Sequence, residues 1–319
     1  MRTSMRVALA AVAAGAAGWL WAAGAAGETA AGFAWKNTEG DHLDLLLDGR
    51  PVLRHMYAFD PSTPARALET YKPYTHVFDA EGKAPITKGP GGLYTHHRGI
   101  FIGWCRLGYD GAKTNDWWHM KGVNQVHREF TETAAGPQAA RLAARIEWVD
   151  GEGKAVVKEV RTMTVRRRPS PTIALLDFES ALAPARGPIT LDGDPEHAGI
   201  HFRPANEVDK KATKYVFPAE GADPRKDKDL AWAAEEFKLG EKTYAVQQMS
   251  HPDNPKGTVW SAYRDYGRFG AFFKKALQAN ETLTVRYRFW VLDGPLPPRE
   301  RLAAEYRAYA EGKEGEAKP

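Results

Sequence analysis

The chain has one cysteine in 319 residues, Cys105, and this scarcity limits how the protein can be stabilised. A single cysteine cannot form an internal disulfide, so stability must come from a hydrophobic core, which a chain of this length can build. Charge is also modest, since 44 Lys and Arg face 40 Asp and Glu, and no basic stripe alternates with aromatic residues. These features disfavour a disulfide scaffold and a nucleic-acid-binding protein.

The sequence has one long apolar run, at the N-terminus, and none after it. Arg2 and Arg6 precede this Ala-rich run from Val7 to Ala23, and small residues follow it. This pattern predicts a signal peptide over residues 1–26 that is cleaved after export. The alternative is an uncleaved anchor, because the run approaches the minimum spanning length of about 17 residues. We therefore expect a secreted or periplasmic protein with no membrane contact beyond this segment.

Several common enzyme signatures are absent as well. The sequence has no Walker A motif, no Gly-x-Gly-x-x-Gly after a strand, no Gly-x-Ser-x-Gly elbow and no His-Glu-x-x-His. The histidine spacings match no closed zinc finger, so a bound metal would be a catalytic one. Nothing in the sequence requires a cofactor, and the histidines are compatible with a bound divalent metal.

Period-two alternation of apolar and polar residues dominates the rest of the chain. It predicts strands over residues 142–148, 156–165, 173–178 and 283–291. Asp48-Gly49 between two apolar runs predicts a tight hairpin. Strands at this short spacing are typical of antiparallel sheets.

Helical periodicity is convincing only near the C-terminus, where Leu302 and Tyr309 recur on one side. Many strands with almost no helix predict an all-β fold, a large antiparallel β-sandwich with a short C-terminal helix. No shift in composition marks a linker. Residues 27–310 are therefore predicted to form a single domain, and residues 311–319 a disordered tail.

The first candidate site motif is His96-His97-Arg98-Gly99, in a region where five of the ten histidines lie between residues 76 and 127. An apolar run follows at residues 100–104, so the imidazoles lie where a loop enters a buried strand. Imidazoles titrate near neutrality and bind metals. We expect His97 to act as an acid or base, His96 to contact substrate and Arg98 to stabilise oxyanion charge. The alternative is a capping histidine with a structural ion pair at Arg98.

The second motif is Asp116-Trp117-Trp118-His119. Asp116 can orient an imidazole and is also expected to contact substrate, and His119 can deliver a proton. Trp117 and Trp118 can form a platform that stacks on a sugar ring. The alternative is that strand alternation divides the tryptophans between core and surface.

The third motif places Glu196, His197 and His201 within six residues. A carboxylate beside an imidazole is the pairing that general acid–base catalysis needs, so we expect catalytic roles for Glu196 and His197. A strand over residues 198–202 would place His197 and His201 on the same face. The alternative is a polar strand face whose hydrogen bonds are satisfied within the fold.

Two further roles concern ligands. Arg264, next to Asp265, is expected to clamp a carboxylate or hydroxyl groups of the substrate. A divalent metal that polarises a carbonyl oxygen would draw its ligands from four imidazoles, those of His97, His119, His197 and His201.

These motifs, in this order, resemble a family of secreted bacterial proteins labelled methane oxygenase PmoA-like. The resemblance implies a β-sandwich similar to the galactose mutarotase-like supersandwich, a fold that often binds carbohydrate and whose enzymes use His with Glu or Asp. The residues that carry it are Tyr71-Lys72-Pro73-Tyr74, Gly91-Gly92-Leu93-Tyr94-Thr95-His96-His97-Arg98-Gly99, Asp116-Trp117-Trp118-His119, Gly193-Asp194-Pro195-Glu196-His197-Ala198-Gly199, His251-Pro252-Asp253-Asn254-Pro255 and Arg264-Asp265-Tyr266-Gly267.

Three functions follow as expectations. The first is an exported carbohydrate-active enzyme, an epimerase, lyase or hydrolase acting on a sugar or glycoside; a two-carboxylate hydrolase would need Asp116 or Asp194 as the partner acid. The second is a non-catalytic glycan-binding module, which leaves the clustered imidazoles without a use. The third is a metal-dependent oxygenase or oxidase, as the label of the resembled family implies.

Overall fold

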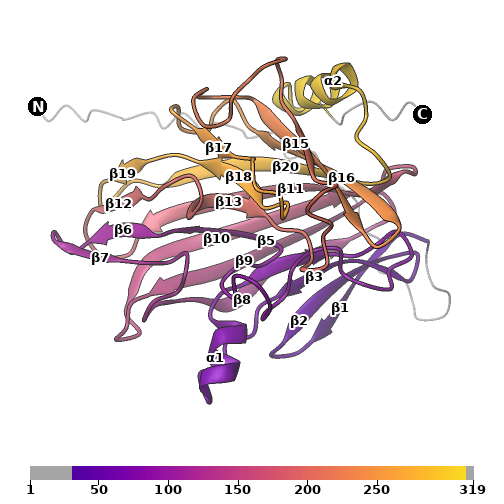
Figure 1. The fold of residues 1–319 in the computed structure, drawn as a ribbon. Helices are drawn as coiled ribbons and strands as arrows, with labels where there is room; N and C mark the ends of the chain where they lie inside the picture. The colour runs from indigo at the N-terminus through magenta and orange to yellow at the C-terminus, as the bar shows by residue number, and fades with distance from the viewer. Residues whose placement is uncertain (1–30, 314–319) are drawn as a thin grey trace, which may run out of the picture.

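The computed structural model describes residues 31–313, which form two large antiparallel sheets and one small sheet (Figure 1). The first sheet has the order β1 (Phe33–Thr38), β2 (His42–Leu47), β3 (Arg50–Met56), β4 (Tyr74–Val77), β5 (Ile100–Trp104), β13 (Ala198–Phe202), β18 (Phe269–Phe272) and β17 (Val259–Ser261). The second has the order β14 (Lys214–Val216), β15 (Trp232–Leu239), β16 (Lys242–Ser250), β20 (Leu283–Asp293), β11 (Thr172–Pro184), β10 (Ala155–Arg166), β9 (Ala139–Val149) and β8 (Asn124–Ala135). The small sheet has the order β19 (Lys275–Leu277), β12 (Ile189–Asp192), β6 (Arg106–Tyr109) and β7 (Lys113–Asn115).

The main core lies between the two large sheets. Alternate residues of β5, among them Ile102 and Trp104, join it from the first sheet, and Leu142 and Trp148 of β9 join it from the second. All four side chains are buried, which is the pattern expected of strands with one face against a partner sheet. The all-β sandwich predicted from the strand pattern is confirmed.

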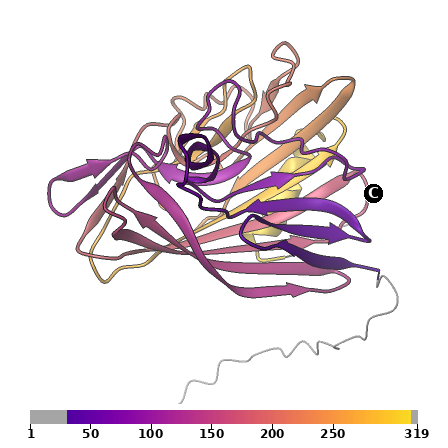
Figure 2. The same ribbon diagram turned by 90° about the horizontal axis from the view of Figure 1, so that it is seen from below.

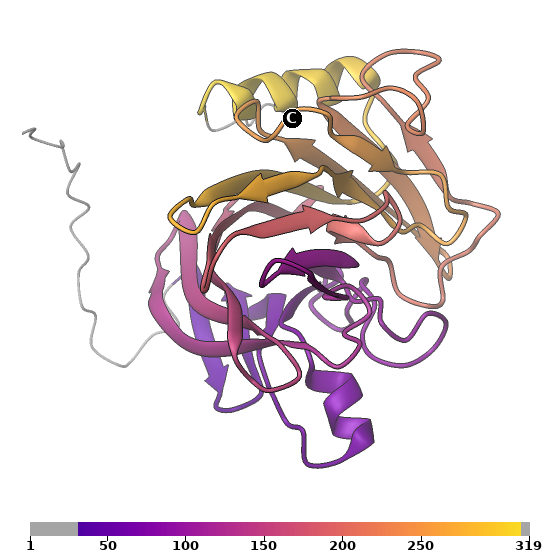
Figure 3. The same cartoon turned by 90° about the vertical axis from the view of Figure 1, so that its left-hand side faces the viewer.

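Two helices lie outside this core. The longer, α2 (Arg299–Ala310), covers the outer face of the second sheet, where Leu302 and Tyr309 pack in a cluster with Trp232 and Trp290 (Figure 3). The shorter, α1 (Pro64–Thr70), projects below the sheets in Figure 1 and is seen end-on in Figure 2. The C-terminal helix is as predicted.

The sequence patterns miss α1 for a physical reason. Seven residues give fewer than two full periods of a helix, so no repeating apolar stripe can be read. Its start does carry a local mark: the Thr63 hydroxyl accepts a hydrogen bond from the backbone N–H of Arg66 at 3.2 Å, and Pro64 occupies the first turn.

The predicted hairpin is present and joins β2 to β3. Its two turn residues, Asp48 and Gly49, both adopt positive φ, at 52° and 80°, as a two-residue hairpin loop requires. The four predicted strands correspond to β9, β10, β11 and β20, of which β11 extends beyond the predicted range to Pro184.

The predicted signal peptide, residues 1–26, lies outside the described residues, as do residues 314–319 of the predicted tail. Between residues 31 and 313, neither helix has the length and apolar character needed to cross a bilayer.

Candidate functional site

The candidate site lies on the outer face of the first sheet, around β5 and β13. Ile200 and Phe202 of β13 point into the main core, so His201 between them points the other way, as does its register partner Phe101. Phe101 packs there with Tyr74 and Trp118 in a small separate cluster. These aromatic side chains form the base on which the site is built.

Four imidazoles from three separate segments meet above this base, and we call His96, His97, His119 and His197 the histidine cluster. The ring centroids of His96 and His97 are 4.4 Å apart, those of His96 and His119 4.3 Å, and those of His119 and His197 5.0 Å. The three motifs of the sequence therefore each contribute to one cluster.

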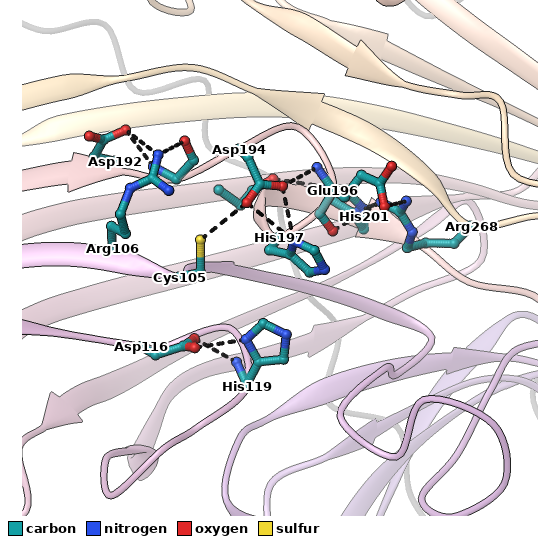
Figure 4. A network of polar contacts seen from close by, with 12 residues as sticks. Cys105, Arg106, Asp116, His119, Asp192, Asp194, Glu196, His197, His201 and Arg268 are labelled. Atoms are coloured by element: carbon teal, nitrogen blue, oxygen red, sulfur yellow. Dashed lines mark hydrogen bonds and ion pairs between the residues drawn. The ribbon is translucent and has the colours of Figure 1, made fainter.

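Asp116 holds His119 in a fixed orientation (Figure 4). Its Oδ1 accepts the backbone N–H groups of Trp118 at 3.0 Å and His119 at 2.8 Å, and its Oδ2 lies 2.7 Å from Nδ1 of the His119 ring. A carboxylate at this position favours the tautomer with the proton on Nδ1, which leaves Nε2 with a free lone pair. The side chain of His119 is 24% exposed, so this nitrogen is on a surface that solvent reaches.

Asp194 and His197 repeat the same local structure. The Asp194 Oδ1 accepts the backbone N–H of Glu196 at 3.0 Å and lies 2.9 Å from the Nδ1 of His197. Both segments therefore have the form Asp-x-x-His, with the aspartate three residues before the imidazole that it orients (Figure 4). The side chain of His197 is 36% exposed. Two carboxylate-oriented imidazoles thus face each other across 5.0 Å.

The carboxyl of Asp116 is held in its ionised form. Burial raises its pKa, but the hydrogen bonds from the His119 ring and backbone outweigh burial and bring the pKa down to about 2. At neutral pH Asp116 is a carboxylate and can orient and stabilise a protonated imidazole.

His96 and His97 are neutral imidazoles. Burial, followed by the neighbouring His119, lowers the pKa of His96 to about 2, and burial with the neighbouring His96 lowers the pKa of His97 further. The Nε2 of His96 and the Nδ1 of His97 are buried without a hydrogen-bond partner. Each ring therefore keeps one buried nitrogen without a partner, and neither ring carries charge near neutral pH.

His201 lies beneath the cluster and is fully engaged. Its Nε2 donates to the carbonyl of Ala198 at 2.9 Å, and its Nδ1 accepts from the Arg268 guanidinium at 3.2 Å. Its ring packs edge-on against Trp118, with centroids 4.5 Å apart. His201 shares a side with His197 as predicted, but with both nitrogens occupied it cannot be the metal ligand predicted for it.

No preformed metal site appears in the described part of the chain. Between residues 31 and 313, no group of three or more His, Cys, Asp or Glu is arranged to hold a metal ion. The predicted set of His97, His119, His197 and His201 therefore does not fit a metal in this arrangement.

The two tryptophans do not form the predicted stacking platform. Trp117 and Trp118 are both 0% exposed. Trp117 belongs to the main core and donates from Nε1 to the carbonyl of Asn124 at 3.2 Å, whereas Trp118 packs against Phe101 at 4.5 Å between ring centroids. Neither alternates to the surface, because the segment 116–120 is a turn closed by Asp116 rather than a strand.

Arg98 also has a different role from the predicted one. It is 0% exposed, and its guanidinium donates to the carbonyls of Thr95, His97 at 2.8 Å and Leu68 at 2.6 Å. A guanidinium that binds three backbone carbonyls inside the protein fixes the loop that carries His96 and His97. The expected oxyanion contact is therefore wrong, and Arg98 positions the histidines.

Glu196 is an anchored carboxylate rather than the predicted base. Its carboxylate accepts from the Tyr263 hydroxyl at 2.8 Å and from Arg264, and Arg268 lies 3.7 Å away. Burial opposes ionisation, but Arg264 and Tyr263 together lower the pKa of Glu196. A carboxylate with a lowered pKa is a weak base. Arg264, 42% exposed, holds Glu196 and still borders solvent.

Two bulky residues beside the cluster adopt strained backbone conformations. Among the described residues, five non-glycine residues have positive φ; three are aspartates, which tolerate it, and the others are Tyr94 at 55° and Met120 at 60°. Tyr94 immediately precedes the His96 segment and Met120 immediately follows His119. Such strain gathers where a ligand site constrains the backbone. Tyr94 is a site residue that the sequence patterns miss, although Gly91-Gly92 before it indicates an irregular loop.

The chain belongs to a family of unknown function, DUF6807, whose model matches residues 42–307. This match assigns no activity and gives no support to the PmoA-like label. No curated protein matches the chain.

Several solved structures of carbohydrate-related proteins are similar to the chain at low identity. A GH36 α-galactosidase from Geobacillus stearothermophilus in complex with raffinose is 10% identical with a TM-score of 0.41, over 86% of this chain and 41% of its own. A putative aldose 1-epimerase from Escherichia coli K12 is 10% identical with a TM-score of 0.34, over 80% of this chain and 97% of its own. A putative kojibiose phosphorylase from the human microbiome is 8% identical with a TM-score of 0.38, over 81% of this chain and 32% of its own. This chain thus spans less than half of the first and third of these proteins.

Proposed function

We propose that this protein is an exported carbohydrate-active enzyme in which His119 and His197 form a general acid–base pair. The observation that carries the proposal is the pair of Asp-x-x-His turns, which place two partly exposed imidazoles 5.0 Å apart with each ring oriented by its own aspartate. An aspartate contact to one histidine is not unusual, as His42 and Asp41 show, but two such imidazoles side by side are suited to joint acid–base catalysis.

The roles divide between the two rings. One imidazole starts neutral and takes a proton from the substrate through its Nε2, and its aspartate stabilises the imidazolium that forms. The other starts as an imidazolium and gives its Nε2 proton to the opposite end of the reacting group, which leaves it neutral. The neutral His96, half-buried against His119, would line the sugar site, and the buried His97 would pack behind it. Arg264, tied to Glu196, would bind a hydroxyl or carboxylate of the sugar.

This arrangement favours some reaction classes over others. A two-carboxylate glycosidase needs one carboxylic acid and one free carboxylate. Here Asp116 and Asp194 are each engaged by their own imidazole. In epimerisation and β-elimination, one group removes a proton from a carbon atom and a second group delivers a proton to carbon or to the leaving group. These reactions therefore suit the site better than two-carboxylate hydrolysis.

The choice of a sugar as substrate rests on two supports. The sequence motifs resemble a family for which a galactose mutarotase-like supersandwich is implied, and that fold often binds carbohydrate. The imidazoles and the Arg264 guanidinium around the site are also the hydrogen-bonding groups that hydroxyl-rich ligands need. Location outside the cytoplasm rests on the signal pattern of residues 1–26.

The test is turnover of a broad panel of sugars, glycosides, uronides and 3-keto sugars, followed by mass spectrometry. His119→Ala and His197→Ala should each reduce turnover by about 100-fold or more, the usual range for loss of a general acid or base. The matched control is His42→Ala, because His42 is also bonded to an aspartate, Asp41, at 2.8 Å but lies outside the cluster. Tight glycan binding without any turnover would instead support a binding module.

A further inference from the structure

We propose that the site takes glycosides whose aglycone is apolar, and that this aglycone rests on an apolar rim formed by Leu68, Leu93 and Tyr94. The inference deepens the proposed function and rests on it. It identifies the part of the substrate that lies next to the reacting sugar.

Exposed apolar side chains are few and unevenly placed. The large hydrophobic residues that are strongly exposed between residues 31 and 313 are five, namely Phe59 at 39%, Leu68 at 39%, Leu93 at 48%, Tyr94 at 43% and Val160 at 43%. Leu93 and Tyr94 are consecutive. Single exposed hydrophobics are normal, whereas a group beside a polar site indicates contact with a ligand.

The end of α1 that carries the exposed Leu68 is tied to the segment that carries Tyr94. The buried guanidinium of Arg98 donates to the carbonyl of Leu68 at 2.6 Å and also to the carbonyl of Thr95. One side chain thus ties the end of α1 to the residue that follows Tyr94. Tyr71, directly after α1, adds a second link, because its hydroxyl lies 3.4 Å from the same Thr95 carbonyl.

Tyr94 connects this rim to the histidine cluster. Its ring centroid is 5.1 Å from that of His97 and 6.4 Å from that of His96. Its φ of 55° is unfavourable for an aromatic residue, and a strained residue persists where the surrounding structure fixes it. A group that rests on the Tyr94 ring therefore lies next to the proposed sugar site.

The chemistry of the rim selects an apolar group rather than a second sugar. A pyranose binds through an aromatic face together with hydrogen-bonding partners, and Leu68 and Leu93 offer neither. An aryl or alkyl group gains from both leucines and from the face of Tyr94, in proportion to the apolar area removed from water.

The test compares matched phenyl and methyl glycosides of glucose, galactose, mannose, xylose and glucuronic acid, in both anomeric forms, with affinity measured by calorimetry. We expect at least one phenyl member to bind about 10-fold tighter than its methyl partner, as burial of an aromatic ring predicts. Tyr94→Ala and Leu93→Ser should each reduce this phenyl-to-methyl ratio by about 3- to 10-fold. Val160→Ala is the matched control, since Val160 is equally exposed but lies in β10 of the other sheet, and its ratio should equal that of the wild type.

Equal affinity for the phenyl and methyl members of every pair, or a ratio unchanged by Tyr94→Ala and Leu93→Ser, would overturn the inference. So would tighter binding of a disaccharide than of the phenyl glycoside of the same sugar. A failure of the proposed function looks different: a clear phenyl preference with no turnover leaves the rim intact and removes the acid–base role.

Discussion

Replacing Asp116 by Asn should disturb the orientation of His119 while preserving the shape of the turn. The Asn side chain still has one oxygen to accept the backbone N–H groups of Trp118 and His119, but its NH₂ group now faces the imidazole. The His119 Nδ1 must then accept rather than donate, so the ring proton moves to Nε2. The nitrogen proposed to receive a proton from substrate would already carry one.

The cost to stability follows from the carboxyl's pKa. Its ordinary value is 3.8 and the folded protein lowers it to about 2. A difference of that size is worth about 2 kcal/mol of folding free energy at neutral pH. Because the folded-state pKa is depressed, this stabilisation is present above about pH 4 and disappears as the pH falls through 2. Asp116→Asn should therefore be about 2 kcal/mol less stable at pH 7, with a gap that narrows below pH 4.

Two assays check this without any knowledge of the substrate. Urea unfolding at pH 7 gives the free-energy difference, and ¹⁵N NMR of the histidine rings reports the tautomer of His119. Asp41→Asn is the control, because it removes the equivalent contact to His42 outside the cluster and should leave the tautomer of His119 unchanged. An unchanged unfolding midpoint together with an unchanged His119 tautomer would refute the reasoning.

Three further outcomes are expected. Gly270→Ala would place a Cβ 2.6 Å from the His201 ring and 2.1 Å from a backbone oxygen; it should lower stability by about 1–3 kcal/mol in urea unfolding, and a wild-type midpoint would show that the ring has room to move. Trp117→Ala should cost about 3–5 kcal/mol while glycan affinity at permissive temperature is retained, because Trp117 lies in the core; selective loss of affinity would restore its predicted stacking role. Glu235 is fully buried without a hydrogen-bond partner, and burial raises its pKa well above the ordinary value. The neutral carboxyl of Glu235 therefore stabilises the fold below about pH 4.5, and this stabilisation is lost as the pH rises. The free energy of unfolding of Glu235→Gln, measured from pH 5 to 8, should rise relative to that of the wild type by up to about 1.4 kcal/mol per pH unit. A difference that stays constant with pH would contradict this.

Local sequence pattern was enough to predict most of the fold. Strands such as β9 and β20 alternate because one face meets the core, and Asp48-Gly49 fixes a hairpin through backbone conformations that few other pairs adopt. The location of the candidate site could also be proposed from the sequence, because clustered imidazoles are unusual in a hydrophobic core. What could not be read was which strands are neighbours, since β5 pairs with β13 across nearly a hundred residues.

The roles of individual residues were less predictable because they depend on burial. Arg98 and His201 carry the right chemistry for a site, yet both face backbone carbonyls inside the protein. Glu196 has a carboxylate that could act as a base, but Arg264, which is distant in the sequence, binds this carboxylate and helps to lower its pKa. A sequence motif names the groups that are available; only the tertiary contacts show which nitrogen or oxygen is free. The repeated Asp-x-x-His spacing was visible in the sequence and would have indicated the oriented pair.

The measurement that tests the central claim most directly is a double-mutant cycle of His119→Ala and His197→Ala on whichever substrate of the panel is turned over. If the two imidazoles act as one acid–base unit, each single variant loses about 100-fold or more in turnover and the double variant loses little beyond that. All three variants should still bind the substrate and unfold as the wild type does. Turnover that survives in both single variants, while His42→Ala also remains active, would contradict the account.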